Sequence, residues 1–162
     1  KIIFLPDELM AKNLQAQTTK KLITWKGRCI VHEDFNADKI ASFRRIHKGL
    51  KVLAHTECPP TVAMSADFVG GTEGMIHYVE KNKAKSYMLV TECGMSERMR
   101  VEMPDKEFVG MCGLCPYMKM NTLANIRQAL VKPVREQIID VPENIRIRAE
   151  KALQKMFQLT NA

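Results

Sequence analysis

The chain has 162 residues, of which 46% are hydrophobic, a length and composition that fit one domain or two small ones around a buried core. No apolar run approaches the roughly 20 residues of a membrane span, and no charged-then-apolar leader opens the chain, so we expect neither a membrane protein nor a secreted one. The net charge of +7 comes from scattered basic residues, and only 6% of the residues are aromatic. Grooves that bind nucleic acid usually carry aromatic rings on which the nucleobases stack. With so few aromatic residues, the basic side chains indicate solvated helix faces rather than a nucleic-acid partner.

Short apolar runs alternate with helical patterns from the first residues onward. Strands are expected at 2–5, 22–25, 50–54, 67–69 and 86–90, and helices are expected to begin at Asp7, at Asn36 or Asp38, at Pro60, at Thr72, at Asn121 and at Pro142. Asp7, Thr72 and Asn121 are predicted to cap their helices. This rhythm predicts an α/β fold with parallel sheets covered on both faces. No clear sequence repeat is visible, although the order strand, polar turn, helix recurs.

Polar and cysteine-containing segments follow four of the predicted strands, at 27–33, 55–58, 70–72 and 91–94. In parallel α/β sheets, ligands bind beyond the carboxyl ends of the strands. We therefore expect these four loops to form one site.

Two of the five cysteines lie in segments that are typical of metal ligands. Cys115 precedes a proline, which stops regular structure and leaves the thiolate facing a pocket, and Cys29 follows a Gly-Arg pair. A zinc site that joins Cys112 and Cys115 to Cys29 and His32 is an alternative. This zinc site is disfavoured because Cys29 and His32, three residues apart in one loop, would both have to turn inward. A thioredoxin-like pair is disfavoured because no helix is expected directly after Cys115.

The odd cysteine count, without a signal peptide, argues against a disulfide framework and fits a reducing cytoplasm. Cys93 and Cys58 are interpreted as small buried hydrophobic residues, and Cys112 is left open.

Two further segments offer polar groups at strand ends. His55-Thr56-Glu57 places an imidazole and a carboxylate after a buried strand, where they could bind an anion and move protons or merely form a polar turn. Gly71 and Thr72 precede a helix, whose N-terminus could hold a carboxylate or phosphate, although such a pair is often only a cap.

Taken together, these segments closely resemble the C-terminal half of quinolinate synthase. They occur in the family's order, cover nearly the whole chain and comprise residues 4–9, 25–33, 55–58, 66–72, 91–95 and 115–123. The resemblance implies a transferase of de novo NAD biosynthesis in the cytoplasm, which condenses iminoaspartate with dihydroxyacetone phosphate to quinolinate. An aspartate oxidase or aspartate dehydrogenase would supply the imine.

The family fold consists of three similar three-layer α/β/α units about a pseudo-threefold axis, with one [4Fe-4S] cluster at the centre. Each unit supplies one cysteine, and Cys29 and Cys115 match two of these ligands as they stand in this sequence. The open iron would act as a Lewis acid. The resemblance places the third cysteine in an N-terminal half that we expect to precede Lys1, so this chain alone is expected to be inactive.

The resemblance also assigns substrate contacts. His55, Thr56 and Glu57 would contact iminoaspartate, with Glu57 moving a proton, while Thr72 beside Gly71 would hold a carboxylate. His32 would line the pocket, and His32, His55 and Glu57 are the expected catalytic residues. The family usually has Pro at Thr56 and Ser at Gly71, and Gly71 lacks the hydroxyl with which that serine could contact substrate.

By the same resemblance, residues 1–34 would end the second α/β unit, 35–118 would form the third, and 119–162 would be C-terminal helices that pack back on the core. The alternative is a non-catalytic α/β binding domain that holds a structural zinc or no metal.

Overall fold

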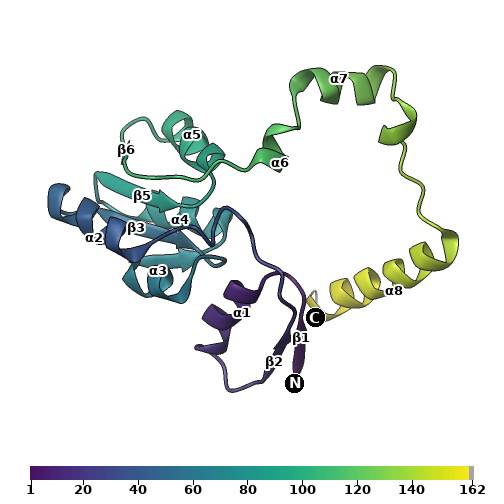
Figure 1. Ribbon diagram of the computed structural model, residues 1–162, viewed down its shortest axis with the longest axis horizontal. Helices are drawn as coiled ribbons and strands as arrows, with labels where there is room; N and C mark the ends of the chain where they lie inside the picture. The colour runs from purple at the N-terminus through teal and green to yellow at the C-terminus, as the bar shows by residue number, and fades with distance from the viewer. Residues whose placement is uncertain (161–162) are drawn as a thin grey trace. The chain divides into compact units, whose positions relative to one another are not determined.

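The computed structural model describes residues 1–160 and divides the chain into two compact units, with the boundary after Lys119. The first unit holds all the strands of the described chain (Figure 1). No helix in the described part of the chain is both long enough and apolar enough to cross a membrane.

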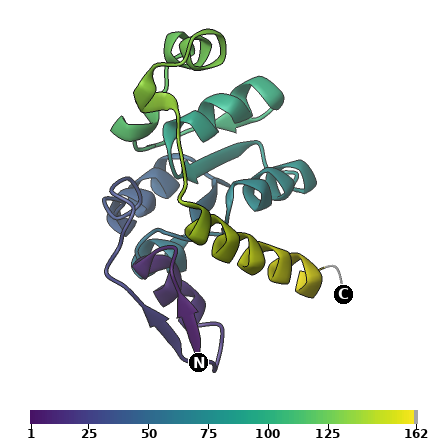
Figure 2. The ribbon, with the colours of Figure 1, turned by 90° about the vertical axis from the view of Figure 1, so that its right-hand side faces the viewer.

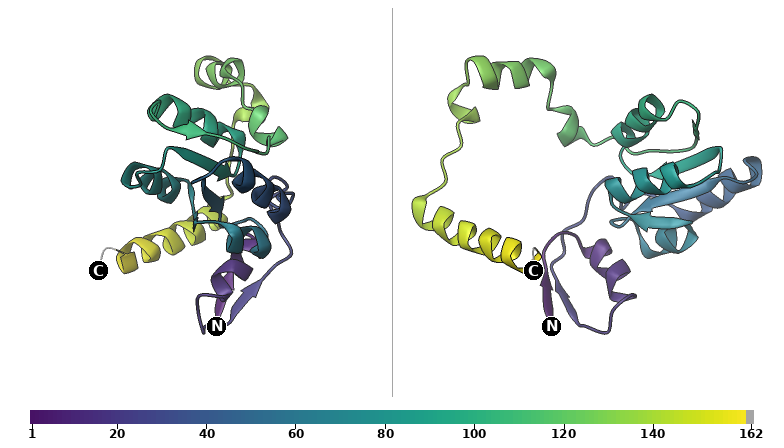
Figure 3. Two further views of the ribbon diagram at one scale, coloured as in Figure 1. Left: turned by 90° about the vertical axis from the view of Figure 1, so that its left-hand side faces the viewer. Right: turned by 180° about the vertical axis from the view of Figure 1, so that it is seen from behind.

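A two-stranded parallel sheet opens the first unit. Strands β1 (Ile2–Phe4) and β2 (Leu22–Thr24) pair with Ile2 opposite Leu22, and helix α1 (Glu8–Gln15) connects them (Figure 3). The side chain of Asp7 accepts a hydrogen bond from the backbone N–H of Met10, as its predicted role as N-cap requires.

The second sheet has four parallel strands in the order β4-β3-β5-β6. They are β3 (Lys51–His55), β4 (Phe68–Gly70), β5 (Ser86–Val90) and β6 (Glu107–Phe108). The helices around them are α2 (Ala37–Ile46), α3 (Pro60–Ser65), α4 (Thr72–Lys81) and α5 (Cys93–Glu102), followed by the short α6 (Pro116–Lys119).

The core of this sheet lies on its two faces, because successive side chains of each strand point to opposite sides. On one face, Val52 packs in a cluster with Ile40 of α2 and Val62 of α3. On the other, Leu53 packs in a cluster with Met75 of α4 and Met99 of α5, and the remaining members of both clusters alternate in the same way. The predicted three-layer α/β/α arrangement with parallel sheets is confirmed, whereas the pseudo-threefold arrangement stays a prediction.

Two of the predicted helix caps are wrong by one residue. Gly71, in extended conformation, is the N-cap of α4 and its carbonyl accepts a bond from Met75, so Thr72 is already the first helical residue. Thr122 rather than Asn121 caps α7, because Thr122 is the extended residue whose hydroxyl accepts from the N–H of Asn125.

The second unit is helical. It contains α7 (Leu123–Val131), the 3-10 helix η1 (Arg135–Gln137) and α8 (Glu143–Thr160), which forms one continuous helix (Figure 2). Pro142 stands directly before α8, as predicted, and its carbonyl accepts from the N–H groups of Ile145 and Arg146. Helices α5 and α6 and strand β6 were not anticipated from the sequence. The domain limits at 34 and 118 and the packing of the C-terminal helices stay predictions.

Candidate functional site

The first part of the site is the loop after β3. His55 is the last residue of that strand, and the chain turns there, with the N–H of Cys58 donating to the carbonyl of His55 at 3.0 Å. The amide of Asn13, which is buried on α1, donates to the carbonyls of Thr56 and Cys58 at 2.8 Å each. Helix α1 therefore fixes the loop that carries Glu57. The role of Asn13 was not predicted from the sequence, because a single polar residue in a helix gives little indication of its contacts.

The second part is the loop after β2. The N–H of Glu33 donates to the carbonyl of Cys29 at 3.1 Å, which closes a turn. This turn brings Cys29 and His32 to the same side, where the Cys29 thiol, the His32 imidazole and the Glu57 carboxylate offer atoms within 4.8 Å of one another. The argument against Cys29 and His32 both turning inward is therefore wrong, because the tight turn between them points both side chains to the same side.

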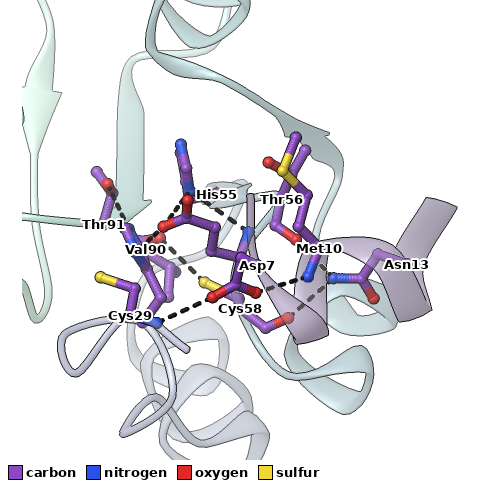
Figure 4. Close-up of polar contacts among 11 residues, drawn as sticks. Asp7, Met10, Asn13, Cys29, His55, Thr56, Cys58, Val90 and Thr91 are labelled. Carbon is purple, nitrogen blue, oxygen red and sulfur yellow. Dashed lines mark hydrogen bonds and ion pairs between the residues drawn. The ribbon is translucent and has the colours of Figure 1, made fainter. Parts of the chain in front are cut away.

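His32 is the centre of the polar contacts. Its Nε2 lies 3.0 Å from the hydroxyl of Thr91, and its ring stacks on that of His55 with centroids 4.4 Å apart. Its Nδ1 is buried and lies 3.0 Å from a carboxylate oxygen of Glu57, the distance of an ion pair, and makes no other polar contact within residues 1–160. Cys29, His55 and Thr91 thus converge from three loops (Figure 4), and the Nδ1 of His32 faces the carboxylate of Glu57.

Burial controls the protonation of both imidazoles. Burial, and then the neighbouring His55, lowers the pKa of His32 to about 4. Burial likewise lowers the pKa of His55, against the raising effect of Glu57. Both rings are therefore neutral near pH 7, so each can donate one hydrogen bond and accept another, and either would become charged on taking up a proton.

The remaining predicted loop, residues 70–72, lies beside this cluster. Gly70 stands opposite His55 in the pairing of β3 with β4, so the N-terminus of α4 adjoins the end of β3. Gly71 and Thr72 are both exposed. A Cβ at Gly71 would meet nothing within 4 Å, so the serine that is usual in the family would fit without clash. The structure brings the other three loops into contact and leaves Gly71 and Thr72 at the rim.

Three cysteines are free thiols within residues 1–160: Cys29, Cys58 and Cys115. Cys58 is buried, its thiol donates to the carbonyl of Val90, and burial raises its pKa to about 12. Its interpretation as a buried hydrophobic residue is confirmed. Cys29 and Cys115 are half-buried.

The remaining two cysteines form a disulfide, which corrects several expectations. Cys93 bonds to Cys112, so Cys93 is not a lone buried residue, and Cys112 is not a partner of Cys115 in a zinc site. The pairing has a structural cause, since the N–H of Cys93 donates to the carbonyl of Gly113 at 3.0 Å and places the two sulfurs side by side. Helix α6 does follow Cys115 directly, so that argument against a thioredoxin-like pair was wrong, although Cys112 has another partner.

The loops that carry the two half-buried thiols touch each other. A Cβ added to Gly113 would lie 2.6 Å from a methyl carbon of Val31, so the two backbones approach where only glycine fits. Cys29 and Cys115 also pack against the same hydrophobic cluster. Two free thiols on adjoining loops, beside a buried imidazole, are a donor set that suits an iron–sulfur cluster held by cysteine thiolates.

Comparison with known proteins agrees with this site. The family model NadA, described as Quinolinate synthetase A protein, matches residues 1–158. Quinolinate synthase 1 of Mesorhizobium japonicum is 46% identical over 157 residues, which cover 97% of this chain and 48% of that protein. The quinolinate synthases of Agrobacterium fabrum and Xylella fastidiosa are 45% and 43% identical, each over 98% of this chain and 46% of their own length.

The chain thus spans about half the length of the curated relatives that it matches. The family model, by contrast, covers almost every residue, including all four loops of the site. On this evidence the chain belongs to the quinolinate synthase family.

Proposed function

We propose that this chain forms part of a quinolinate synthase, a transferase that condenses iminoaspartate with dihydroxyacetone phosphate, with loss of phosphate and water. The proposal places it in de novo NAD biosynthesis in the cytoplasm, with an aspartate oxidase or aspartate dehydrogenase as the source of the imine. Its partner would be the N-terminal half of the same protein (the partner polypeptide), which corresponds to the rest of its relatives' length. The 162 residues alone would be inactive.

Cys29 and Cys115 are the residues that would hold a [4Fe-4S] cluster. Both are free and half-buried, and their loops are in contact, which supports a shared group. The third thiolate would come from the partner polypeptide. When bound, the cluster supplies an iron without a protein ligand, which can act as a Lewis acid.

Glu57, His55 and His32 would handle the protons of the condensation. The Nδ1 of His32 is buried and faces the carboxylate of Glu57. The carboxylate of Glu57 lies within reach of both imidazoles, at 3.0 Å from His32 and 3.6 Å from His55. Through these contacts a proton taken up by Glu57 can pass to a ring nitrogen of either imidazole, which would then be a transient imidazolium.

The carboxylates of iminoaspartate would bind at the rim. The exposed N-terminus of α4 begins at Thr72, and its free N–H groups and positive dipole end favour an anion beside His55. The backbone of Thr56, which Asn13 holds in place, borders the same space.

The observation that carries the proposal is the convergence of Cys29, His32 and Glu57 from two loops, with ligand atoms within 4.8 Å of one another. The test is quinolinate formation by the chain combined with its partner polypeptide. We expect Glu57→Gln to lower kcat by about 100-fold or more. The matched change Glu80→Gln, at an exposed position near the C-terminal end of α4, should leave kcat unchanged. Equal activity of Glu57→Gln and the wild type would contradict the role of Glu57.

One observation favours a second function. The same three side chains could bind a single zinc ion, since thiolate, imidazole and carboxylate are all zinc ligands. In that case the chain would be a non-catalytic binding domain with a structural metal. The two proposals differ in the metal that the protein contains.

A further inference from the structure

Two segments of the first unit have the same construction. The first repeat, residues 2–29, consists of β1, α1, β2 and a loop that ends at Cys29. The second repeat, residues 86–115, consists of β5, α5, β6 and a loop that ends at Cys115. In each, the two strands are parallel neighbours. Each loop ends in Gly-x-Cys, which the sequences share although little else matches.

The same backbone bond closes both loops onto their helices. The N–H of Glu8, the first residue of α1, donates to the carbonyl of Gly27 at 2.8 Å. The N–H of Cys93, the first residue of α5, donates to the carbonyl of Gly113 at 3.0 Å. In both repeats the glycine stands two residues before the free cysteine, so the two loops are fixed in equivalent positions.

A buried carboxylate occupies the same place in each repeat. Asp7 caps α1 through one oxygen, and its other oxygen accepts from the N–H of Cys29 at 2.9 Å (Figure 4). Glu92 caps α5 by accepting from Gly94 at 2.6 Å, and its other oxygen lies 3.4 Å from the N–H of Cys115. Asp7 and Glu92 are only 3% and 9% exposed, so water competes little for these bonds.

We propose that Asp7 and Glu92 are equivalent positioning residues, which hold the backbone of Cys29 and Cys115 so that both thiolates face one iron–sulfur cluster. This inference rests on the proposed function for the cluster, but the bonds themselves belong to the chain alone. A bond from an N–H to a buried carboxylate is stronger than one between neutral groups. Each carboxylate therefore joins the first turn of a helix to the backbone of a cysteine and so fixes the orientation of that cysteine.

The test separates capping from positioning. In Asp7→Ser the hydroxyl can still cap α1 but offers no second acceptor for Cys29. In Glu92→Gln the amide oxygen can replace only one of the two carboxylate oxygens. Asn36→Ala removes the cap of α2, a side chain that accepts from Asp38 and forms no bond to either cysteine, and is the matched control. If Asp7→Ser does not fold, Asp7→Asn, of the same shape, replaces it.

The first readout is amide hydrogen exchange in the chain without metal. We expect exchange at Cys29 to rise at least about tenfold in Asp7→Ser, with Cys115 unchanged, and the reverse pattern in Glu92→Gln, since loss of one bond to a charged group opens the amide. Asn36→Ala should change neither. Unchanged exchange at both cysteines in the two variants overturns the inference, whatever metal the protein binds.

The second readout is the cluster, reconstituted without oxygen on the chain combined with its partner polypeptide. We expect a lower iron content, and a shifted electron paramagnetic resonance spectrum after reduction, in Asp7→Ser and Glu92→Gln but not in Asn36→Ala. Iron uptake by the wild type with unchanged spectra in both variants overturns the positioning role alone. A wild type that takes up no iron overturns the proposed function and with it the role of the two carboxylates at a cluster.

Discussion

The two repeats differ in the side chains that tie each cysteine loop to its helix. In the first, an ion pair of 2.8 Å joins Glu8, at the start of α1, to Arg28. In the second, the disulfide from Cys93 to Cys112 joins the start of α5 to the loop. The same link is thus made by two kinds of chemistry, one exposed and sensitive to salt, the other covalent and sensitive to reductant.

The parts that do not differ are the buried carboxylate and the Gly-x-Cys end of the loop. An aspartate serves in one repeat and a glutamate in the other, yet each binds the N–H of a free cysteine. The comparison indicates that both repeats require the thiol to be held in place. The link between loop and helix, an ion pair in one repeat and a disulfide in the other, can vary.

The largest expected effect comes from removing the thiols themselves. Cys29→Ser and Cys115→Ser should each abolish the brown iron–sulfur absorbance of the reconstituted protein, because both repeats contribute a ligand. Cys112→Ser, the same change three residues before Cys115, should keep it. Full absorbance in either of the first two variants would remove that cysteine from the ligand set.

The next effect is on stability and belongs to the second repeat. Cys93→Ser opens a link between residues 19 apart in sequence and should cost roughly 3 kcal/mol of unfolding free energy in urea. Cys112→Ser should cost the same, and the double variant no more than either single one. Additive losses would show that the two sulfurs act separately.

A smaller effect is expected from the first repeat. Arg28→Ala should shift the urea midpoint less than Cys93→Ser does, and about 1 M salt should reduce the difference from the wild type, since both side chains are partly exposed to solvent. Arg28, then Lys12, lowers the pKa of Glu8 from 4.5 to about 2. The ion pair therefore stabilises the fold above pH 4.5, and this contribution is lost as the pH falls through about 2. A salt-independent loss would contradict this account.

The smallest effect is expected at Cys58, which belongs to neither repeat. Iodoacetamide at about pH 8 should modify Cys29 and Cys115 in the folded, metal-free chain, while Cys58 stays unmodified, because only thiolates react and its pKa is raised to about 12. Mass spectrometry of peptides gives the result, and modification of all three thiols after unfolding is the control. Rapid labelling of Cys58 in the folded chain would contradict its buried position.

Much of the fold follows from local patterns in the sequence. The apolar runs predicted the strands β1 to β5 to within about one residue, and Asp7 was identified as a cap because it precedes an amphipathic run. Helix α5 was missed because it lacks a clear apolar stripe: Met95 and Met99 are buried among charged and small residues. Strand β6 has only two residues, too few for a pattern.

The site was predicted in outline by the positions of loops after strands, but its contacts were not. The stacking of His32 on His55 depends on a turn that brings Cys29 and His32 together. The disulfide was missed because spacing along the chain does not identify partners. The family resemblance predicted similar units that each supply a cysteine, but the equivalence of Asp7 and Glu92 was not predicted, because they differ in type and only the folded backbone shows that they bind equivalent groups.

The metal content of the wild-type protein, prepared without oxygen together with the polypeptide that supplies the third cysteine, tests the central claim most directly. Elemental analysis should give about four irons per complete protein and no stoichiometric zinc, as one [4Fe-4S] cluster requires. One zinc and no iron would contradict the enzyme proposal, and would assign Cys29, His32 and Glu57 to a structural site instead.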